Sequence, residues 1–111
     1  MKVSEITTAV IAQQLREDVS ALSQSDIDYI DALKSAAISY VESETGIYGV
    51  NEADENGRKL DDYEDITIAV LVLISDMYDQ RQFTVDKKDI NRVVEGIINH
   101  YRFNLVPEAE A

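Results

Sequence analysis

The sequence contains no cysteine and only one histidine, His100. Without cysteine the chain can form neither a disulfide framework nor a thiolate nucleophile, and one histidine cannot complete the usual zinc or iron ligand sets. The sequence also lacks a glycine-rich phosphate loop and a Ser-His-Asp order. We therefore expect no metal site, no cofactor and no enzymatic activity.

Long apolar runs are missing as well. The longest uninterrupted one, Ile68 to Ile74, is far shorter than the roughly 20 residues that span a bilayer. Residues 1–5 carry one lysine and one glutamate and are followed by no apolar export core. We expect a protein that neither crosses a membrane nor is secreted.

Positive charge is scarce, because 22 acidic residues face 10 basic ones and the net charge is −12. Such a field repels phosphate backbones and anionic membrane surfaces, which disfavours a conventional DNA-binding role. The acids are unevenly spread: residues 51–65 alone hold seven acids and two bases. One end of the molecule should therefore be markedly more negative.

What is present indicates one folded, all-α domain. The 111 residues, 45% of them apolar, suffice for a single core, and no stretch shows sustained strand-like alternation. Caps and apolar periodicity predict a small bundle of about four helices, with a long acidic loop between the second and third. We assign residues 1–102 to this domain and residues 103–111, which include the only proline, to an extended C-terminal tail.

The helix boundaries follow from local signals. The first helix is expected over about 7–15, and the second should start at Ser25, with Asp28 at its positive end, and close at Gly46. The third should run over about 63–82, primed by acids 61–65. Because its apolar positions nearly encircle it, we expect it to be the central helix of the domain or of an assembly.

The fourth helix is predicted to begin at Asp86. Its predicted buried stripe consists of Ile90, Val94, Ile97 and Tyr101. Gly96 interrupts this helix at a cost of about 1 kcal/mol relative to alanine, which suggests that a neighbouring backbone approaches closely.

Two acidic segments could suggest metal sites. Residues 52–57 resemble the first half of an EF-hand loop, but Tyr63 stands where a bidentate glutamate is needed, so a solvated loop is favoured. The carboxylates of residues 61–65 could be imagined as magnesium ligands of a nuclease. Helix capping is the favoured interpretation, because no lysine or histidine is suitably spaced to act as a base.

The whole chain resembles the head-tail connector family of tailed bacteriophages, small adaptor proteins attached below the portal. The resemblance is carried by Leu15-Arg16-Glu17-Asp18, by residues 26–46 with Ala36-Ala37 and Tyr40-Val41-Glu42, by Tyr78-Asp79-Gln80-Arg81, and by Asn99-His100-Tyr101-Arg102. None of these motifs is catalytic. Their order and spacing and the total length make the match.

The resemblance implies a structural virion protein at the head-tail junction that resides in the host cytoplasm before assembly. By this resemblance it would form a dodecameric ring, dock on the portal and contact a head-closure or tail-completion protein. The ring would extend the channel through which DNA passes without sequence-specific binding. The candidate residues are Tyr40, Leu71, Tyr78 and Arg81 for the ring interface, Glu52, Asp54 and Glu55 for the channel or tail side, and Tyr101, Arg102, Phe103, Leu105 and Val106 for portal docking.

Two other functions remain open. An acidic DNA mimic or antitoxin-like regulator would occupy a basic groove of a partner, and its binding would depend strongly on salt. A metal-dependent hydrolase would need the carboxylates of residues 61–65 to bind magnesium.

Overall fold

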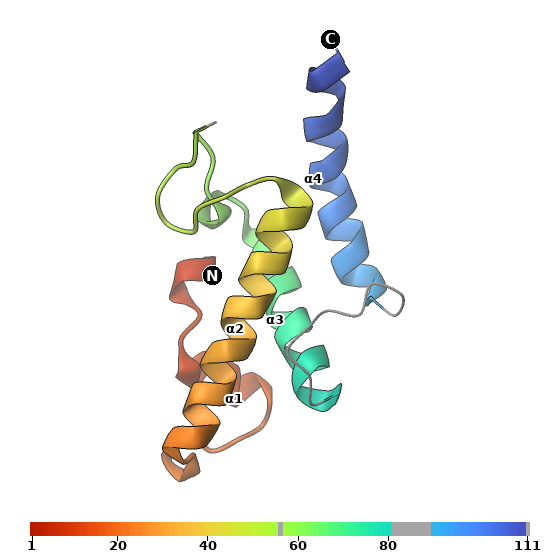
Figure 1. Ribbon diagram of the computed structural model, residues 1–111. Coiled ribbons are helices and arrows are strands. Elements are labelled where there is room, and N and C mark those ends of the chain that lie inside the picture. The colour runs from red at the N-terminus through yellow and green to blue at the C-terminus, as the bar shows by residue number, and fades with distance from the viewer. Residues whose placement is uncertain (56, 81–89, 111) are drawn as a thin grey trace.

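The computed structural model describes residues 1–55, 57–80 and 90–110, with the backbone alone for 19 and 102–110. These residues form four α-helices and no strand, which confirms the all-α prediction (Figure 1). The helices are α1 (Thr8–Gln14), α2 (Gln24–Thr45), α3 (Glu64–Gln80) and α4 (Arg92–Glu110). Three short 3-10 turns complete the described chain: η1 (Val3–Glu5), η2 (Val19–Ala21) and η3 (Leu60–Asp62).

The N-cap of α2 lies two residues before the predicted cap, Ser25. This N-cap is Ser23, whose hydroxyl accepts from the Asp26 N–H while the Asp26 carboxylate accepts from the Ser23 N–H. Both serines have an aspartate three residues later, so the pattern alone fits either start. Ser23 additionally places Leu22 and Ile27 at the two positions of a hydrophobic staple. The predicted end is confirmed, because Gly46 adopts a left-handed conformation with φ +75°.

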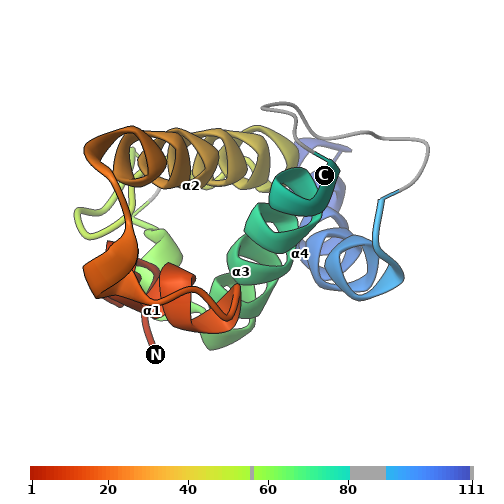
Figure 2. The same cartoon turned by 90° about the horizontal axis from the view of Figure 1, so that it is seen from below.

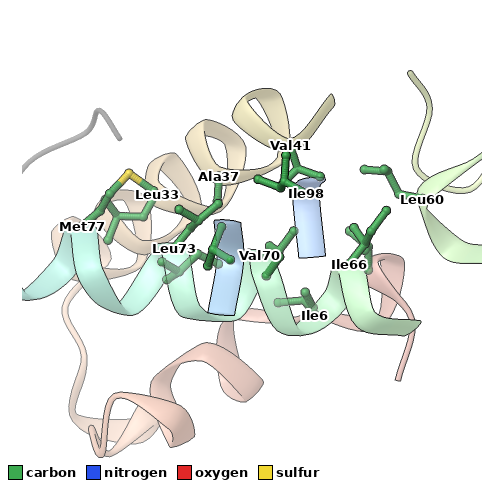
Figure 3. Packing of buried hydrophobic residues seen from close by; sticks show 14 of the residues in the cluster. Ile6, Leu33, Ala37, Val41, Leu60, Ile66, Val70, Leu73, Met77 and Ile98 are labelled. Carbon is green, nitrogen blue, oxygen red and sulfur yellow. The ribbon is translucent and has the colours of Figure 1, made fainter. Parts of the chain in front are cut away.

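α3 is the central helix of the domain, as the sequence predicted. It packs against α1, α2, α4, η1 and η3, and Figure 2 shows it between α1 and α4, with α2 across one side. Two sets of fully buried side chains meet where α2 and α3 pack together (Figure 3): Leu33, Ala37 and Val41 from α2, and Ile66, Val70, Leu73 and Met77 from α3.

The N-terminal segment is part of the core. Val3 and Ile6 are fully buried, the Lys34 ammonium donates to the Ile6 carbonyl at 2.6 Å, and the Thr67 hydroxyl donates to the Met1 carbonyl at 2.9 Å. These contacts fix η1 against α2 and α3.

α1 fits its predicted span and is followed by a residue with an unusual backbone conformation. The Glu17 N–H donates to the Ala12 carbonyl and the Arg16 N–H to the Gln13 carbonyl, which together form a Schellman motif. Arg16 occupies the position usually held by glycine, with φ +62°.

α4 starts later than predicted. Asp86 lies outside the described residues, but Ile90 and Asn91 are described and are not helical. The Asn91 side-chain oxygen accepts from the Val93 N–H at 2.8 Å, so Asn91 caps the helix. The prediction that Ile90 belongs to this helix is wrong, because the competing cap was overlooked.

The buried face of α4 also differs from its prediction. Val94, Ile98 and Tyr101 are buried, whereas Ile97 is half-buried. Gly96 is exposed, and a Cβ built there meets no atom within 4 Å. Within the described residues no neighbouring backbone approaches Gly96, because α4 packs through another face, so the predicted close approach is not found there.

The segment predicted as an extended tail is helical, because α4 continues to Glu110. Residues 102–110 contain no glycine stop, and five of the nine are good helix formers: one arginine, one leucine, one alanine and two glutamates. Pro107 fixes φ at a helix-compatible value and removes one N–H donor, which did not suffice to end the helix.

Within the described residues, no helix is both long and apolar enough to span a bilayer.

Candidate functional site

The acidic loop after α2 is closed by one of its own acids. The Asp54 carboxylate accepts from the Tyr48 N–H at 3.1 Å and from the Arg58 N–H at 3.0 Å, and the Asp54 N–H donates to the Arg58 carbonyl at 2.7 Å. Asp54 is therefore half-buried and engaged inside the loop. Of the three predicted channel-side or tail-side acids, only Glu52 and Glu55 are exposed.

A second acid and a glycine hold the base of this loop. The Gly49 N–H donates to the Glu42 carboxylate at 2.9 Å, and Gly49 has φ +122°. A Cβ at Gly49 would lie 2.4 Å from the Glu52 carbonyl oxygen, so only glycine fits. The loop is thus preorganised and presents Tyr48 to solvent, with 57% of this residue exposed.

The acids of residues 61–65 serve separate structural roles. Asp61 accepts from both the N–H and the hydroxyl of Ser4, at 2.9 and 2.5 Å. Asp62 lies 3.9 Å from Lys59, an exposed ion pair that contributes little stability. Asp65 accepts from the Tyr101 hydroxyl.

Only two of these acids begin the helix, which corrects the prediction that the whole cluster caps it. Asp61 and Asp62 lie in η3, while Glu64 and Asp65 occupy the first turn of α3. The difference arises because the buried Leu60 and the Ser4 contact hold Asp61 in the turn before the helix. Among the described residues, no three carboxylate, histidine or cysteine side chains are grouped so that they could hold a metal ion.

The predicted ring-interface residues contribute partly to the chain's own packing. The Tyr78 hydroxyl donates to Glu17 at 3.0 Å, and its ring lies 6.1 Å from that of Tyr29. The half-buried Leu71 has a carbonyl that accepts from the Gln14 amide at 2.9 Å. Tyr40 is half-buried on α2, and Arg81 lies outside the described residues.

Of the predicted portal-docking residues, the structure describes the side chain of Tyr101 alone. Tyr101 is 8% exposed, meets the Tyr63 ring edge-on at 5.0 Å and donates its hydroxyl proton to Asp65. Burial, reinforced by the hydrogen bond to Asp65, raises the pKa of Tyr101 well above its usual range. Tyr101 is thus committed to the core, whereas the side chains of Arg102, Phe103, Leu105 and Val106 lie outside the described part.

Sequence reasoning did not single out the exposed apolar residues of α3 and α4. Ile68 on α3 is 52% exposed and Val93 on α4 is 55% exposed, while Val72 and Ile97 next to them are half-buried. The continuous apolar run in α3 was a usable signal, because a helix with apolar residues nearly all round needs partners on every side.

Asp76 lies on α3 one turn after Val72. It has no hydrogen bond or ion pair with any residue that the structure describes. Partial burial, reinforced by the nearby charge of Asp79, raises the pKa of Asp76. Both acids lie in the last two turns of α3, where the helix dipole favours cations. Their placement therefore opposes the fold locally.

No known family model, curated protein or solved structure matches this chain.

Proposed function

We propose that this chain is a non-enzymatic structural subunit of the ring that joins a phage head to its tail. The observation that carries this proposal is that two large apolar side chains, Ile68 on α3 and Val93 on α4, are exposed. A helix that touches every other helix of its domain and still leaves a large apolar side chain in water is suited to burial in an assembly. The resemblance of the chain to connector proteins supplies the identity of that assembly.

A ring requires one surface of each subunit to bind a different surface of its neighbour, with a rotation that closes. Leu71 borders Ile68 on α3 and would extend the apolar surface toward such a neighbour. The exposed acids Glu52 and Glu55 on a preorganised loop suit a channel wall or tail-side contact, because negative charge lets DNA slide without sticking. The portal and a head-closure or tail-completion protein are the other partners in this proposal.

Electron microscopy of lysates from the phage with this gene deleted, compared with a complemented control, tests the proposal. Heads and unattached tails should accumulate separately in the deletion lysate. Complementation with Ile68→Glu should fail, whereas the matched variant Ser39→Glu, on the exposed face of α2, should restore virions. Normal, infectious virions from the deletion would reject the connector role.

An acidic regulator that binds a basic protein is the second candidate. It is favoured by the net charge of −12, since 22 acidic residues face 10 basic ones. Affinity for such a partner should fall steeply between low and high salt, whereas largely apolar ring contacts should change little. A salt titration of complex formation separates the two.

A further inference from the structure

Arg16, two residues after the end of α1, has a left-handed backbone conformation with φ +62°. Such a conformation strains any residue that has a Cβ, and glycine is therefore the usual residue at this place in a helix end. The Arg16 side chain is exposed and forms no hydrogen bond or ion pair with any residue that the structure describes. The described fold of the single chain thus gives no reason for an arginine here.

The two acids that follow Arg16 are engaged with other groups. The Glu17 carboxylate accepts from the Tyr78 hydroxyl at 3.0 Å. The Asp18 carboxylate accepts from the N–H and the hydroxyl of Ser20, at 3.0 and 2.7 Å. Both acids therefore have a role inside the chain, whereas the Arg16 guanidinium is left for a contact outside it. A strained residue without an internal role is a reason to look for a functional one.

The backbone that carries Arg16 is fixed against α3, which lies beside α1 (Figure 2). On one side of Arg16 in the sequence, the Gln14 amide donates to the Leu71 carbonyl at 2.9 Å. On the other side, Glu17 holds the Tyr78 hydroxyl. Arg16 is therefore preorganised, which lowers the entropic cost of binding. It is also attached directly to Leu71 and Tyr78, two of the residues expected at the ring interface.

The chemistry of Arg16 and the charge of the chain together specify the partner. A guanidinium binds a carboxylate through two parallel N–H···O bonds. Copies of a chain with 22 acids and 10 bases repel one another unless a cation of one copy meets an acid of the next. We propose that Arg16 binds a carboxylate of a neighbouring copy of this chain. This inference rests on the proposed function for the statement that copies adjoin in a ring.

The test compares full-length variants in two measurements, the melting temperature of the purified chain and the plaque titre of the gene-deleted phage complemented with it. Arg16→Gln removes the charge and keeps the strained backbone, whereas Arg16→Gly removes both. Arg16→Lys keeps the charge without the planar fork of donors. Arg92→Gln, at an exposed arginine of α4, is the matched control for the loss of one positive charge.

We expect Arg16→Gly to raise the melting temperature by roughly 3–6 °C, because glycine relieves the strain. The plaque titre should nevertheless fall by about tenfold or more with Arg16→Gly and with Arg16→Gln, since one lost contact recurs at every interface of the ring. Arg16→Lys should restore part of the titre, and Arg92→Gln should behave like the unaltered chain. A more stable variant that fails to complement cannot owe its failure to misfolding.

Photo-crosslinking identifies the partner. The chain has no cysteine, so Gln13→Cys introduces a single thiol at an exposed position one helical turn before Arg16. The purified chain with a photoreactive group on this thiol is added to the lysate of the deletion phage and illuminated. We expect an adduct of two copies in which the attached peptide contains aspartate or glutamate. Its yield should fall when Arg16→Gln is added and stay unchanged with Arg92→Gln.

The proposal is overturned if Arg16→Gln and Arg92→Gln lower the titre equally, if no adduct forms, or if the adduct contains a portal or tail protein in place of a second copy. A lower melting temperature of Arg16→Gly would also overturn it, because Arg16 would then stabilise the end of α1 through the helix dipole. Normal virions from the gene deletion reject the connector role itself. Full complementation by Arg16→Gln of a phage that needs this gene rejects the role of Arg16 alone.

Discussion

The body of the molecule, residues 1–80, and α4 are held in place by different kinds of contact. Polar side chains connect elements of the body that are distant in sequence: Ser4 with Asp61, Thr8 with Asp31, Gln14 with Leu71 and Ser75, Glu17 with Tyr78, Lys34 with Ile6, and Thr67 with Met1. The described part of α4 buries Val94, Ile98 and Tyr101, and the Tyr101 hydroxyl donates to Asp65 in the body.

The difference shows which part of the fold is fixed by directional contacts and which part keeps exposed side chains. Hydrogen bonds fix geometry, so the body has one arrangement of η1, α1, α2 and α3. Among its described side chains, α4 buries Val94 and Ile98, and apolar contacts of this kind are less directional. On this helix Val93 is exposed, and among the described residues no atom lies within 4 Å of a Cβ built at Gly96.

The largest expected effect is in the body. Leu33→Ala removes a fully buried side chain from the contact between α2 and α3 and should lower the free energy of unfolding by about 2–5 kcal/mol. Chemical denaturation followed by far-UV circular dichroism measures it. The same loss from an exposed-site variant such as Ser39→Ala would show that burial at Leu33 is not the cause.

The loop of the body should show the next effect. Gly49→Ala places a Cβ 2.4 Å from the Glu52 carbonyl and imposes φ +122° on alanine, which should cost about 2–3 kcal/mol. Gly57→Ala is the matched control: it has φ +73° but no atom within 4 Å of its Cβ, so it should cost about 1 kcal/mol. Equal destabilisation of the two variants in urea denaturation would contradict the close contact at Gly49.

The attachment of α4 is probed by Tyr101→Phe, which removes the hydrogen bond to Asp65 and keeps the ring. The free energy of unfolding should fall by about 1 kcal/mol, because water can reach the half-buried Asp65.

The chain with Tyr101 should also lose stability as pH rises above about 10. The pKa of Tyr101 is higher in the folded state than in the unfolded one, so the folded state keeps a proton that the unfolded state releases. Denaturation curves from pH 9 to 11 that fall equally for both proteins would refute this role.

Gly96→Ala should have the smallest effect and the opposite sign. It should raise the free energy of unfolding by about 0.8–1 kcal/mol, because alanine favours a helix and its Cβ meets open space. Thermal unfolding measures the gain. A lower melting temperature would mean that Gly96 has a contact within the chain after all.

The sequence was most informative where local chemistry has one solution. Gly46 was recognised as the end of α2, and the apolar rows of α3 identified the central helix. It was less informative where two local signals compete: Ser23 and Ser25 both have an aspartate three residues later, and Asn91 rather than Asp86 caps the described α4.

The candidate site was less predictable than the fold, because its residues depend on which faces of α3 and α4 pack inside. Helical periodicity marks Ile68 and Ile97 as apolar but cannot tell which apolar positions remain exposed. Nor can the sequence show that Asp54 closes its own loop or that Tyr101 is buried against Asp65, since both depend on contacts across the fold.

Native-state amide hydrogen exchange of the full chain tests the difference between the two regions most directly. The buried turns of α2 and α3 should exchange only through global unfolding, whereas α4 residues 94–101 should exchange through an opening of lower free energy that Tyr101→Phe lowers further. Equal opening free energies for α3 and α4, unchanged in Tyr101→Phe, would contradict the account by showing that α4 is bound as firmly as the body.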